Sequence, residues 1–496
     1  MNGLIPHLPA LQVIVPMLAA PVLALLAPRG LAWAAATLVS LMAFAIAVQL
    51  TILVLAGQVP GYFMGSWPAP FGIELRIDDF SVLMLLVLTG ASTVSLIGGR
   101  QSIDLEIETE RQPLFYSAWA LALAGLAGII VSADAFNVFV FMEISSLASY
   151  VLIAGGPDRR ALPAVFKYLI MGTIGATFYL IGIGLIYLMT GTLNLADMEL
   201  RIHEVGDQRP ILVAAGFITV GLALKAAVFP LHVWLPNAYT YAPNIVSVFM
   251  AACATKVSLY VLLRFDFFVF QQNLTQHDIQ FAAFLMPLAV AAIVVGSAVA
   301  VFEKNLKRLL AYSSVAQVGY ILLGASLVSV AGLTASLLHM FNHALAKGAL
   351  FMAVACLATR LGGLRIPDLR GVARTMPLTT AALVIAALSL IGIPGTAGFV
   401  SKWYLISALL GMGGLGIMLI AVVVIGSLLA VVYVWRIVES LRSLENAESN
   451  KPGEAPMMLL LTTMAASLAN LWFGLSPALP IELAQRSAAA LLVHLP

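Results

Sequence analysis

Runs of about 20 consecutive apolar residues, each long enough to cross the hydrocarbon core of a bilayer as a helix, recur along the whole chain. There are about fourteen of them, centred near residues 18, 44, 89, 122, 146, 176, 220, 254, 291, 319, 346, 386, 422 and 466. The runs are continuous, whereas the strands of a membrane β-barrel alternate apolar and polar residues. Since only helices and closed barrels satisfy the backbone inside a bilayer, the pattern predicts an all-α polytopic membrane protein.

The composition excludes a water-soluble globule, because 61% of the residues are hydrophobic, 10% are charged and the mean hydropathy is +1.02. The first run follows MNGLIPHLP, which carries no Lys or Arg and precedes no clear cleavage site. We therefore expect a retained helix rather than a signal peptide. The net charge of +2 indicates neither an acidic nor a basic partner.

The sequence carries no phosphate-binding loop, dinucleotide fingerprint or haem motif. We accordingly expect no cofactor, no metal ion and no nucleic-acid partner. Cys253 and Cys356 fall within predicted spans and have no CxxC spacing, so we interpret them as inert packing residues.

The positive charges predict the topology. If the first helix enters from the outside, fifteen Lys and Arg residues fall in inner connections and five in outer ones. This bias, with an even number of spans, places both termini on the outer side. The longest connections follow the second and sixth spans and have about twenty residues each, too few to form a domain.

The remaining five positive charges are all lysines within or at the ends of predicted spans: Lys167, Lys225, Lys256, Lys347 and Lys402. Arginine keeps its proton under essentially all conditions, whereas a buried lysine can release one. Glu143 is the only acid that we place deep in a span. Ionisable groups inside a membrane are functional candidates by default. The presence of lysines and the absence of arginines within the spans therefore indicate proton handling.

One predicted helix, SLLHMFNHALAKGALFMAVACLA, aligns three titratable residues. His339, His343 and Lys347 recur at i, i+4 and i+8, which places them along one helix face. Histidine exchanges protons near pH 6.5, so such a row suits a proton relay. The alternative is that each histidine only forms a hydrogen bond to a neighbouring helix.

Two hydrophobic segments are interrupted by helix breakers, and each carries a lysine. Lys225 lies in GLALKAAVFPLHVWLP and Lys402 in LSLIGIPGTAGFVSKWY. Such a pair, five spans apart, predicts two inverted five-helix repeats with broken helices 7 and 12. We expect four parts: residues 1–110 with helices 1–3, 111–265 with helices 4–8, 279–443 with helices 9–13, and 455–496 with helix 14 and a tail.

Other interpretations compete for several of these residues. Glu143 and Lys225 could form a purely structural ion pair. Lys256 and Lys402 could extend toward lipid headgroups, and this snorkelling is the favoured interpretation for Lys167, which follows GGPDRRALP. Two further candidates are weaker. His232 follows the first helix break and would face the inner side, and Asp134, in VSADAFN, could equally cap a helix.

The chain resembles the antiporter-like subunits shared by respiratory complex I, membrane-bound hydrogenases and Mrp-type multisubunit sodium/proton antiporters. The resemblance rests on FNVFVFMEISSLASYVL, LALKAAVFPLHVWLPNAYTYAP, ATKVSLYVLLR, NLKRLLAYSSVAQVGY, HMFNHALAKGALF and GIPGTAGFVSKWYLI. These motifs occur in the family's order over roughly residues 78–440.

The resemblance implies roles for the matching residues. Glu143 corresponds to the acid of the fifth helix, which modulates the proton affinity of Lys225 on the broken seventh helix. Lys256 corresponds to the connecting lysine of the eighth helix. His339 and His343 take the place of the eleventh-helix relay, and Lys402 that of the terminal lysine on the broken twelfth helix.

The stretch GSWPAPFGIELRIDDFSVLMLL and the chain length resemble the D-type subunits of Mrp antiporters. This implies a secondary transporter subunit, not an enzyme, in a bacterial inner membrane. Its partners would be membrane lipid and subunits of the A, B, C, E, F and G types, and it would couple proton movement to export of Na⁺ or K⁺.

Three alternatives stay open. The chain also resembles the fourteen-helix complex I subunit that has a terminal lysine, and the hydrogenase counterpart, in which it would be a proton-pumping module. A third possibility is a structural subunit whose charged interior is vestigial.

Overall fold

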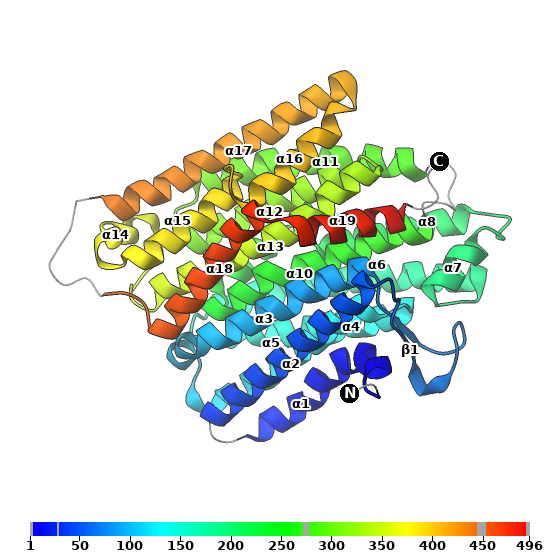
Figure 1. The fold of residues 1–496 in the computed structure, drawn as a ribbon, viewed down its shortest axis with the longest axis horizontal. Coiled ribbons are helices and arrows are strands. Elements are labelled where there is room, and N and C mark those ends of the chain that lie inside the picture. Colours follow the sequence, from blue (N-terminus) through cyan, green and yellow to red (C-terminus); the bar gives the residue numbers. More distant parts are fainter. Residues whose placement is uncertain (1–2, 27–28, 271–276, 444–452, 493–496) are drawn as a thin grey trace.

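The computed structural model describes residues 3–26, 29–270, 277–443 and 453–492. Long helices lie side by side and make up nearly the whole molecule (Figure 1). The first half contains α1 (Leu8–Leu25), α2 (Arg29–Leu55), α3 (Asp79–Glu106), α4 (Gln112–Val131), α5 (Ala135–Ala154), α6 (Ala161–Thr190), α7 (Leu195–Ile202), α8 (Arg209–Lys225), α9 (Leu235–Tyr241) and α10 (Asn244–Arg264). The second half contains α11 (His277–Phe302), α12 (Leu306–Ala325), α13 (Val330–Ala358), α14 (Val372–Thr375), α15 (Pro377–Ile391), α16 (Ala397–Leu410), α17 (Gly413–Arg442), α18 (Met457–Leu475) and α19 (Ala478–Leu491).

Eleven helices in the described part of the chain are long and apolar enough to cross a membrane. Three more segments complete the bundle: the interrupted pairs α8–α9 and α15–α16, and α12, which carries several polar side chains. Together with the eleven helices, these three segments correspond to the fourteen predicted hydrophobic runs. The predicted all-α membrane fold is confirmed, with one short addition, a hairpin of β1 (Gly61–Phe63) and β2 (Glu74–Arg76).

Both predicted helix breaks are present. Between α8 and α9 the chain forms turns from Ala226 to Trp234, and the indole Nε1 of Trp234 donates to the carbonyl of Leu224 at 3.0 Å. Between α15 and α16, Gly392 and Gly395 have positive φ angles of 90° and 87°, which glycine adopts without strain. Each break frees carbonyl groups that need other partners, because lipid supplies none.

The packing pattern repeats five spans later. In the first unit α4 packs on α5 and α6 on α8, and in the second α11 packs on α12 and α13 on α15 and α16. Since five is odd, the second unit runs through the bundle in the opposite sense. The division into residues 1–110, 111–265, 279–443 and 455–496 agrees with this pattern, and we keep its boundaries as a proposal.

The end of the chain differs from the prediction. We expected a tail after the fourteenth helix, but residues 478–491 form α19, which packs on α13 and α3. Arg486 on α19 pairs with Asp79 at 2.8 Å and donates to the carbonyl of Val54 at 2.9 Å. A C-terminal stretch of low hydropathy is helical here because its apolar side is buried against the bundle.

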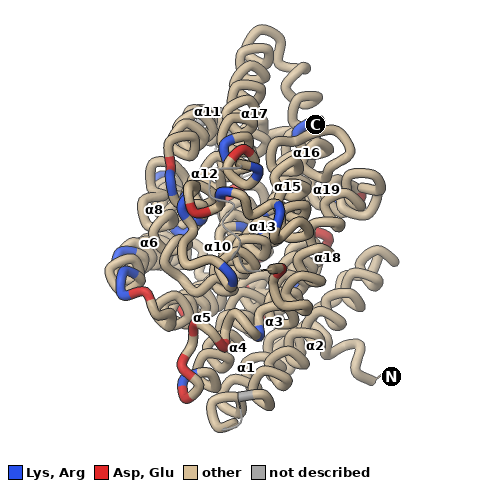
Figure 2. Tube along the Cα trace, turned by 90° about the vertical axis from the view of Figure 1, so that its left-hand side faces the viewer, with Lys and Arg blue, Asp and Glu red and all other residues tan. Residues whose placement is uncertain are grey.

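The hairpin lies at one end of the bundle, at the right of Figure 1, where it contacts α1, and its Arg76 lines the same cavity as Ser487 of α19. The ring of His7, just before α1, lies 5.6 Å from that of Tyr62 in β1. Lys and Arg residues gather in the loops at the opposite end, which faces the viewer in Figure 2. Because basic loops favour the inner side of a membrane, we label this second end inner and the hairpin end outer, and this sidedness is part of the function proposed below.

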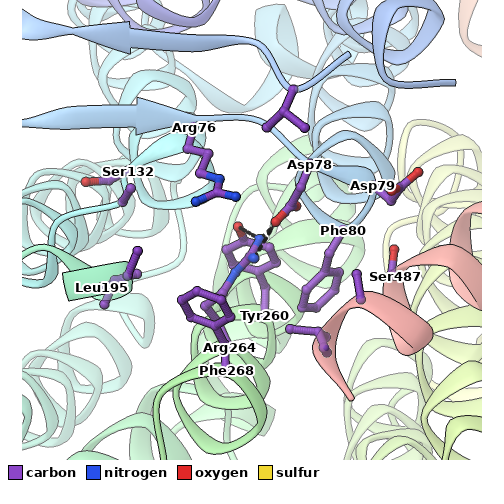
Figure 3. Close-up of a pocket in the computed structure, with 15 residues that line it drawn as sticks. Arg76, Asp78, Asp79, Phe80, Ser132, Leu195, Tyr260, Arg264, Phe268 and Ser487 are labelled. Atoms are coloured by element: carbon purple, nitrogen blue, oxygen red, sulfur yellow. Dashed lines mark hydrogen bonds and ion pairs between the residues drawn. The ribbon is translucent and has the colours of Figure 1, made fainter. Parts of the chain in front are cut away.

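The outer end is held by an ion pair between helices that lie far apart in the sequence. Asp78 caps α3 by accepting from the Ser81 amide at 2.9 Å, and Arg264 at the end of α10 contacts both of its oxygens, at 2.5 and 2.9 Å. The pair lies at the wall of a cavity of about 230 Å³ (Figure 3). Burial favours the neutral acid, but the Arg264 guanidinium and the Ser81 hydrogen bonds outweigh it and lower the pKa of Asp78 to about 2.

Asp78→Asn should therefore destabilise the protein at neutral pH. The pKa of Asp78 lies below its ordinary value of 3.8, so its charge stabilises the fold above about pH 4, and this contribution is lost as the pH falls through 2. The shift corresponds to about 2 kcal/mol. Thermal unfolding in detergent should show a lower midpoint for the variant at pH 7 and a difference from wild type that shrinks on acidification.

Glu108→Gln is the matched control, because the Glu108–Arg111 pair is exposed, with 73% and 71% of the two side chains accessible. An equal loss of stability in both variants at pH 7 would contradict the role given to Asp78.

Candidate functional site

Five lysines are buried in the described bundle: Lys225, Lys256, Lys307, Lys347 and Lys402, with exposed fractions of 6%, 0%, 4%, 0% and 5%. Four of them were predicted inside spans from the sequence. Keeping an ammonium group in such surroundings is costly, so the partners of each nitrogen decide what the group can do.

Lys225 is the last residue of α8, at the first helix break. Its Nζ lies 3.1 Å from Glu143 Oε1 on α5 and donates to the Ser146 hydroxyl at 2.8 Å. The two charges differ in exposure, since 4% of the Lys225 side chain is accessible but 30% of that of Glu143. The predicted pair is therefore formed, and its carboxylate is reachable from the surface.

Lys256 lies in the middle of α10 and bends back along its own helix. Its Nζ donates to the carbonyl of Ala251 at 2.5 Å. It lies close enough to α13 to interact electrostatically with His339, His343 and Lys347. The lysine of the first repeat thus faces the histidine row of the second.

The two histidines of α13 have different surroundings. His339 is held on both sides, by Ser401 Oγ at Nδ1 and by Gln317 Oε1 at Nε2, each at 2.8 Å. His343 stacks beside it with a centroid separation of 6.2 Å, and neither of its nitrogens has a hydrogen-bond partner among the described residues. One ring is fixed, and the other is free to pair with an approaching donor.

Lys347 lies one turn beyond His343 along α13. Its Nζ donates to the carbonyl of Leu310 at 2.6 Å and to the hydroxyl of Ser313 at 2.5 Å. Both acceptors belong to α12. The ammonium group is therefore held between two helices of the second repeat by neutral oxygens.

Lys402 is on α16, after the second break, and its side chain points back into that break. Its Nζ donates to the carbonyls of Ile391 at 2.7 Å and Leu390 at 3.3 Å, which are the last carbonyls of α15, and to the hydroxyl of Ser427 at 3.0 Å. It also lies 4.7 Å from the centre of the Tyr320 ring. The negative end of a half-helix and a ring face stabilise this cation, and snorkelling toward headgroups is not observed.

Several of these groups lie on helices that pack around α13. This helix packs against α10, α12 and α16, which carry Lys256, the neutral acceptors and Lys402. Among the described residues, Lys256, Lys347 and Lys402 donate only to carbonyl and hydroxyl oxygens. Neutral acceptors stabilise an ammonium group less than a carboxylate does, so such a lysine can give up its proton and take it back.

A family model described as "NADH:quinone oxidoreductase/Mrp antiporter, TM" matches residues 132–430, which is more than half of the chain. The chain belongs to this family. The resemblance seen in the motifs is thereby confirmed.

Relatives from both branches of the NADH:quinone oxidoreductase/Mrp antiporter family are similar to the chain. The N-type subunit of the NADH-quinone oxidoreductase of Desulforudis audaxviator is 43% identical over 441 residues, covering 88% of this chain and 86% of that protein. The D-type subunit of the Na(+)/H(+) antiporter of Bacillus subtilis is 32% identical over 414 residues, covering 83% and 82%.

Two solved assemblies contain chains of the same fold. A subunit of the archaeal membrane-bound sulfane sulfur reductase superposes with a TM-score of 0.90 at 28% identity, covering 98% of both chains. One from the Mrp complex of Dietzia sp. gives 0.88 at 28% identity, covering 99% of this chain and 98% of that one. Both are multisubunit membrane complexes, which supports partner subunits for this chain.

The three weaker candidates from the sequence lie apart from the buried lysines and histidines described above. Lys167 is exposed on α6, as snorkelling requires, and we leave it out of the line of buried groups. Asp134 caps α5 by accepting from the Asn137 amide at 2.6 Å, and burial raises the pKa of its carboxyl. His232 lies in the first break, stacked on Phe229 and 6.3 Å from the Tyr312 ring of the second repeat.

One expectation about charge was wrong, and one buried acid was missed. Asp266, in a π-helical turn after α10, is 1% exposed and accepts from Thr219, but it lies at the end of its span and not deep in it as Glu143 does. Lys307, which we counted in an inner connection, is buried and donates to the carbonyl of Ala242 at 2.6 Å. Both lie at ends of apolar runs, where hydropathy alone does not separate loop from buried helix.

Sequence reasoning missed the neutral polar partners. Ser146, Ser313, Gln317, Ser401 and Ser427 each touch one of the titratable groups. The polar residues of α12 recur at helical spacing and could have indicated a polar face. In the described residues there is no group of three or more His, Cys, Asp or Glu side chains that could hold a metal ion.

The Glu143–Lys225 pair should respond unequally to loss of either partner. Glu143→Gln leaves a buried ammonium with only Ser146, whereas Lys225→Met leaves a carboxylate whose side chain is 30% exposed at the surface of the chain. Removing one partner of a buried pair costs about 3–5 kcal/mol. We expect Glu143→Gln to lower the thermal unfolding midpoint of the purified assembly more than Lys225→Met does.

Raising the pH should narrow the deficit of Glu143→Gln, because the unpaired lysine can then lose its proton. A larger loss for Lys225→Met, or a deficit that does not depend on pH, would argue against this description of the pair.

Proposed function

We propose that this chain is the proton-translocating subunit of a multisubunit cation/proton antiporter of the Mrp type, in which it takes the place of the D-type subunit. Protons would move through Glu143, Lys225, Lys256, His339, His343, Lys347 and Lys402 while Na⁺ or K⁺ is exported by the assembly. The observation that supports the proposal is the set of buried lysines and histidines on α8, α10, α13 and α16, helices that pack in succession from one break to the other.

The Glu143–Lys225 pair would act as the switch. An opposite charge within about 4–6 Å shifts a pKa by about 1–3 units, equivalent to about 1.4–4 kcal/mol. The 3.1 Å contact is within this range, and the Glu143 side chain is exposed enough to respond to a charge that approaches from outside the chain. Opening the pair would lower the proton affinity of Lys225 and release its proton toward the centre.

The α10–α13–α16 line would carry the proton onward. A bare charge cannot cross roughly 30 Å of hydrocarbon, but a row of groups divides the distance into short steps. Lys256 and Lys347 would exchange with His343, whose nitrogens have no other described partner, and His339 would pass the proton through Ser401 toward Lys402. Because the lysines contact neutral carbonyl and hydroxyl oxygens, each of them can release its proton and take it up again.

The proposed setting is a bacterial inner membrane, with both termini on the outer side and the basic loops of Figure 2 inside. The proposed partners are the A, B, C, E, F and G types of antiporter subunit and membrane lipid. The 32% identical D-type antiporter subunit of Bacillus subtilis and the Mrp assembly of Dietzia sp. support this assignment.

A second candidate is a proton-pumping subunit of a redox complex. The 43% identity with an N-type subunit of NADH-quinone oxidoreductase and the similarity to an archaeal respiratory complex favour it. The same residues would have the same roles, but the driving charge would come from electron transfer. The chain would then be a translocase subunit.

The deciding measurement is fluorescence dequenching of ΔpH in everted vesicles from an antiporter-deficient host that carries the native operon. Added Na⁺ or K⁺ should dissipate ΔpH with wild type. Glu143→Ala and Lys225→Ala, in assemblies of normal abundance, should slow this exchange roughly tenfold or more because the proton step is lost. Lys167→Ala, at an exposed lysine outside the line, should exchange at the wild-type rate.

The other outcomes separate the candidates. If no cation acts but NADH or another electron donor drives acidification that the two variants abolish, the redox function replaces the antiporter. If Glu143→Ala and Lys225→Ala keep full exchange, the charged interior has no transport role.

A further inference from the structure

A polar cavity of about 590 Å³ opens at the inner end of the bundle. The end of α3, the loop before α6, the corner between α9 and α10, the start of α12 and the loop after α13 contribute to its wall. These loops lie among the charged groups that face the viewer in Figure 2. The cavity touches none of the seven residues of the proposed pathway, and the helix break at Lys225 does not line it.

Lys307 is the buried charge in the wall of this cavity. It lies in the first turn of α12, and its Nζ donates to the carbonyl of Ala242 in the α9–α10 corner at 2.6 Å. Glu106 binds the other side of the same corner, accepting from the Asn244 amide at 2.9 Å and from its side chain at 2.9 Å. The acid and the lysine attract each other across the corner.

The helix that carries Lys307 also carries the partners of the central relay. The carbonyl of Leu310 and the hydroxyl of Ser313 hold Lys347, and Gln317 holds His339. Leu310 and Ser313 lie about 5 and 9 Å along the helix axis from Lys307. The helix α12 thus runs from the cavity wall, at Lys307, to the residues that hold Lys347 on α13.

This link reaches the histidine helix without the Glu143–Lys225 pair. It begins in water at the inner end, at Lys307, and continues through Ser313 to Lys347 and then to His343. In this order the Lys307 ammonium gives a proton to water, water passes it through the Ser313 hydroxyl to a neutral Lys347 amine, and hydronium from the cavity then protonates Lys307 again. The proton count balances at each step.

The charges in the wall suit protons and oppose alkali cations. Five basic residues line the cavity against three acidic ones: Arg160, Lys304, Lys307, Arg308 and Arg365 against Glu106, Asp158 and Glu303. A positively charged mouth repels all monovalent cations, hydronium included. A proton can nevertheless pass along hydrogen-bonded water to an amine without a hydrated ion entering, whereas Na⁺ and K⁺ must enter as ions.

We infer that this cavity is an inner-side proton inlet that excludes alkali cations, and that Lys307 is its first protonatable group. The inference rests on the proposed function, because an inlet has meaning only if the α13 line conducts protons. It adds a site and a direction to that function: protons from the inner side join the relay at Lys347.

The test replaces Lys307 by cysteine in the assembled complex. Lys307→Cys should slow proton-coupled exchange in everted vesicles roughly tenfold or more, since the amine is lost. Aminoethyl methanethiosulfonate restores a titratable amine at this position and should restore exchange. Trimethylammonioethyl methanethiosulfonate adds a fixed positive charge of similar reach and should not.

Two controls accompany this experiment. Wild type receives both reagents in parallel, and its own Cys253 and Cys356 are each 0% exposed. Arg374→Cys places a thiol at an exposed basic position of α14, away from the cavity wall, and should react without any change in exchange.

Each other outcome overturns the inference. If Lys307→Cys exchanges at the wild-type rate, or if the trimethylammonium reagent restores exchange as well as the amine does, Lys307 only holds the corner. If the cysteine does not react from the inner face, the cavity does not open there. Wild type and Lys225→Ala are measured in parallel to test the proposed function independently. If Lys225→Ala loses exchange while Lys307→Cys keeps the wild-type rate, the proposed function stands and only the inlet is refuted.

Discussion

A bilayer offers no hydrogen bonds to a polypeptide, and the rest of this structure depends on that constraint. It makes every crossing a helix, and it makes each interruption of a helix a place where carbonyl groups need partners. The structure supplies them from side chains. Trp234 binds the carbonyl freed at the first break, and Lys402 binds two carbonyls at the second. A helix break therefore provides free carbonyl oxygens that can bind a polar or charged side chain inside the bundle.

The same constraint explains why the buried charges are arranged as they are. A permanent ion pair at every lysine would fix the protons, and a lysine without partners would not stay charged. Lys256, Lys347 and Lys402 rest on carbonyl and hydroxyl oxygens, while Lys225 alone of the predicted lysines contacts a carboxylate. In the proposed function, the one ion pair is the switch and the lysines held by neutral oxygens are the relay that follows it. The central place of α13 brings the two repeats into one line.

Much of the site could be predicted because a membrane makes certain residues conspicuous. A lysine within an apolar run has few explanations, so Lys225, Lys256 and Lys402 were evident without coordinates. Ser313, Gln317 and Ser401 are unremarkable in a sequence, and only packing shows that they hold Lys347 and His339. The burial of Asp266 and Lys307 was not predicted from the sequence, because both lie where an apolar run ends. Whether a residue is buried there depends on which neighbouring helix covers it.

By itself the sequence determined the fourteen crossings, the two helix breaks and the choice of titratable residues, because hydrophobic length, proline and charge act locally along the chain. Only the tertiary structure decided that α19 is a packed helix, that Lys225 precedes its break while Lys402 reaches back into its own, and that α12 joins an inner cavity to the histidine row. These features depend on contacts between segments far apart in the chain. Such contacts follow from how the helices fit together, and no local pattern encodes them.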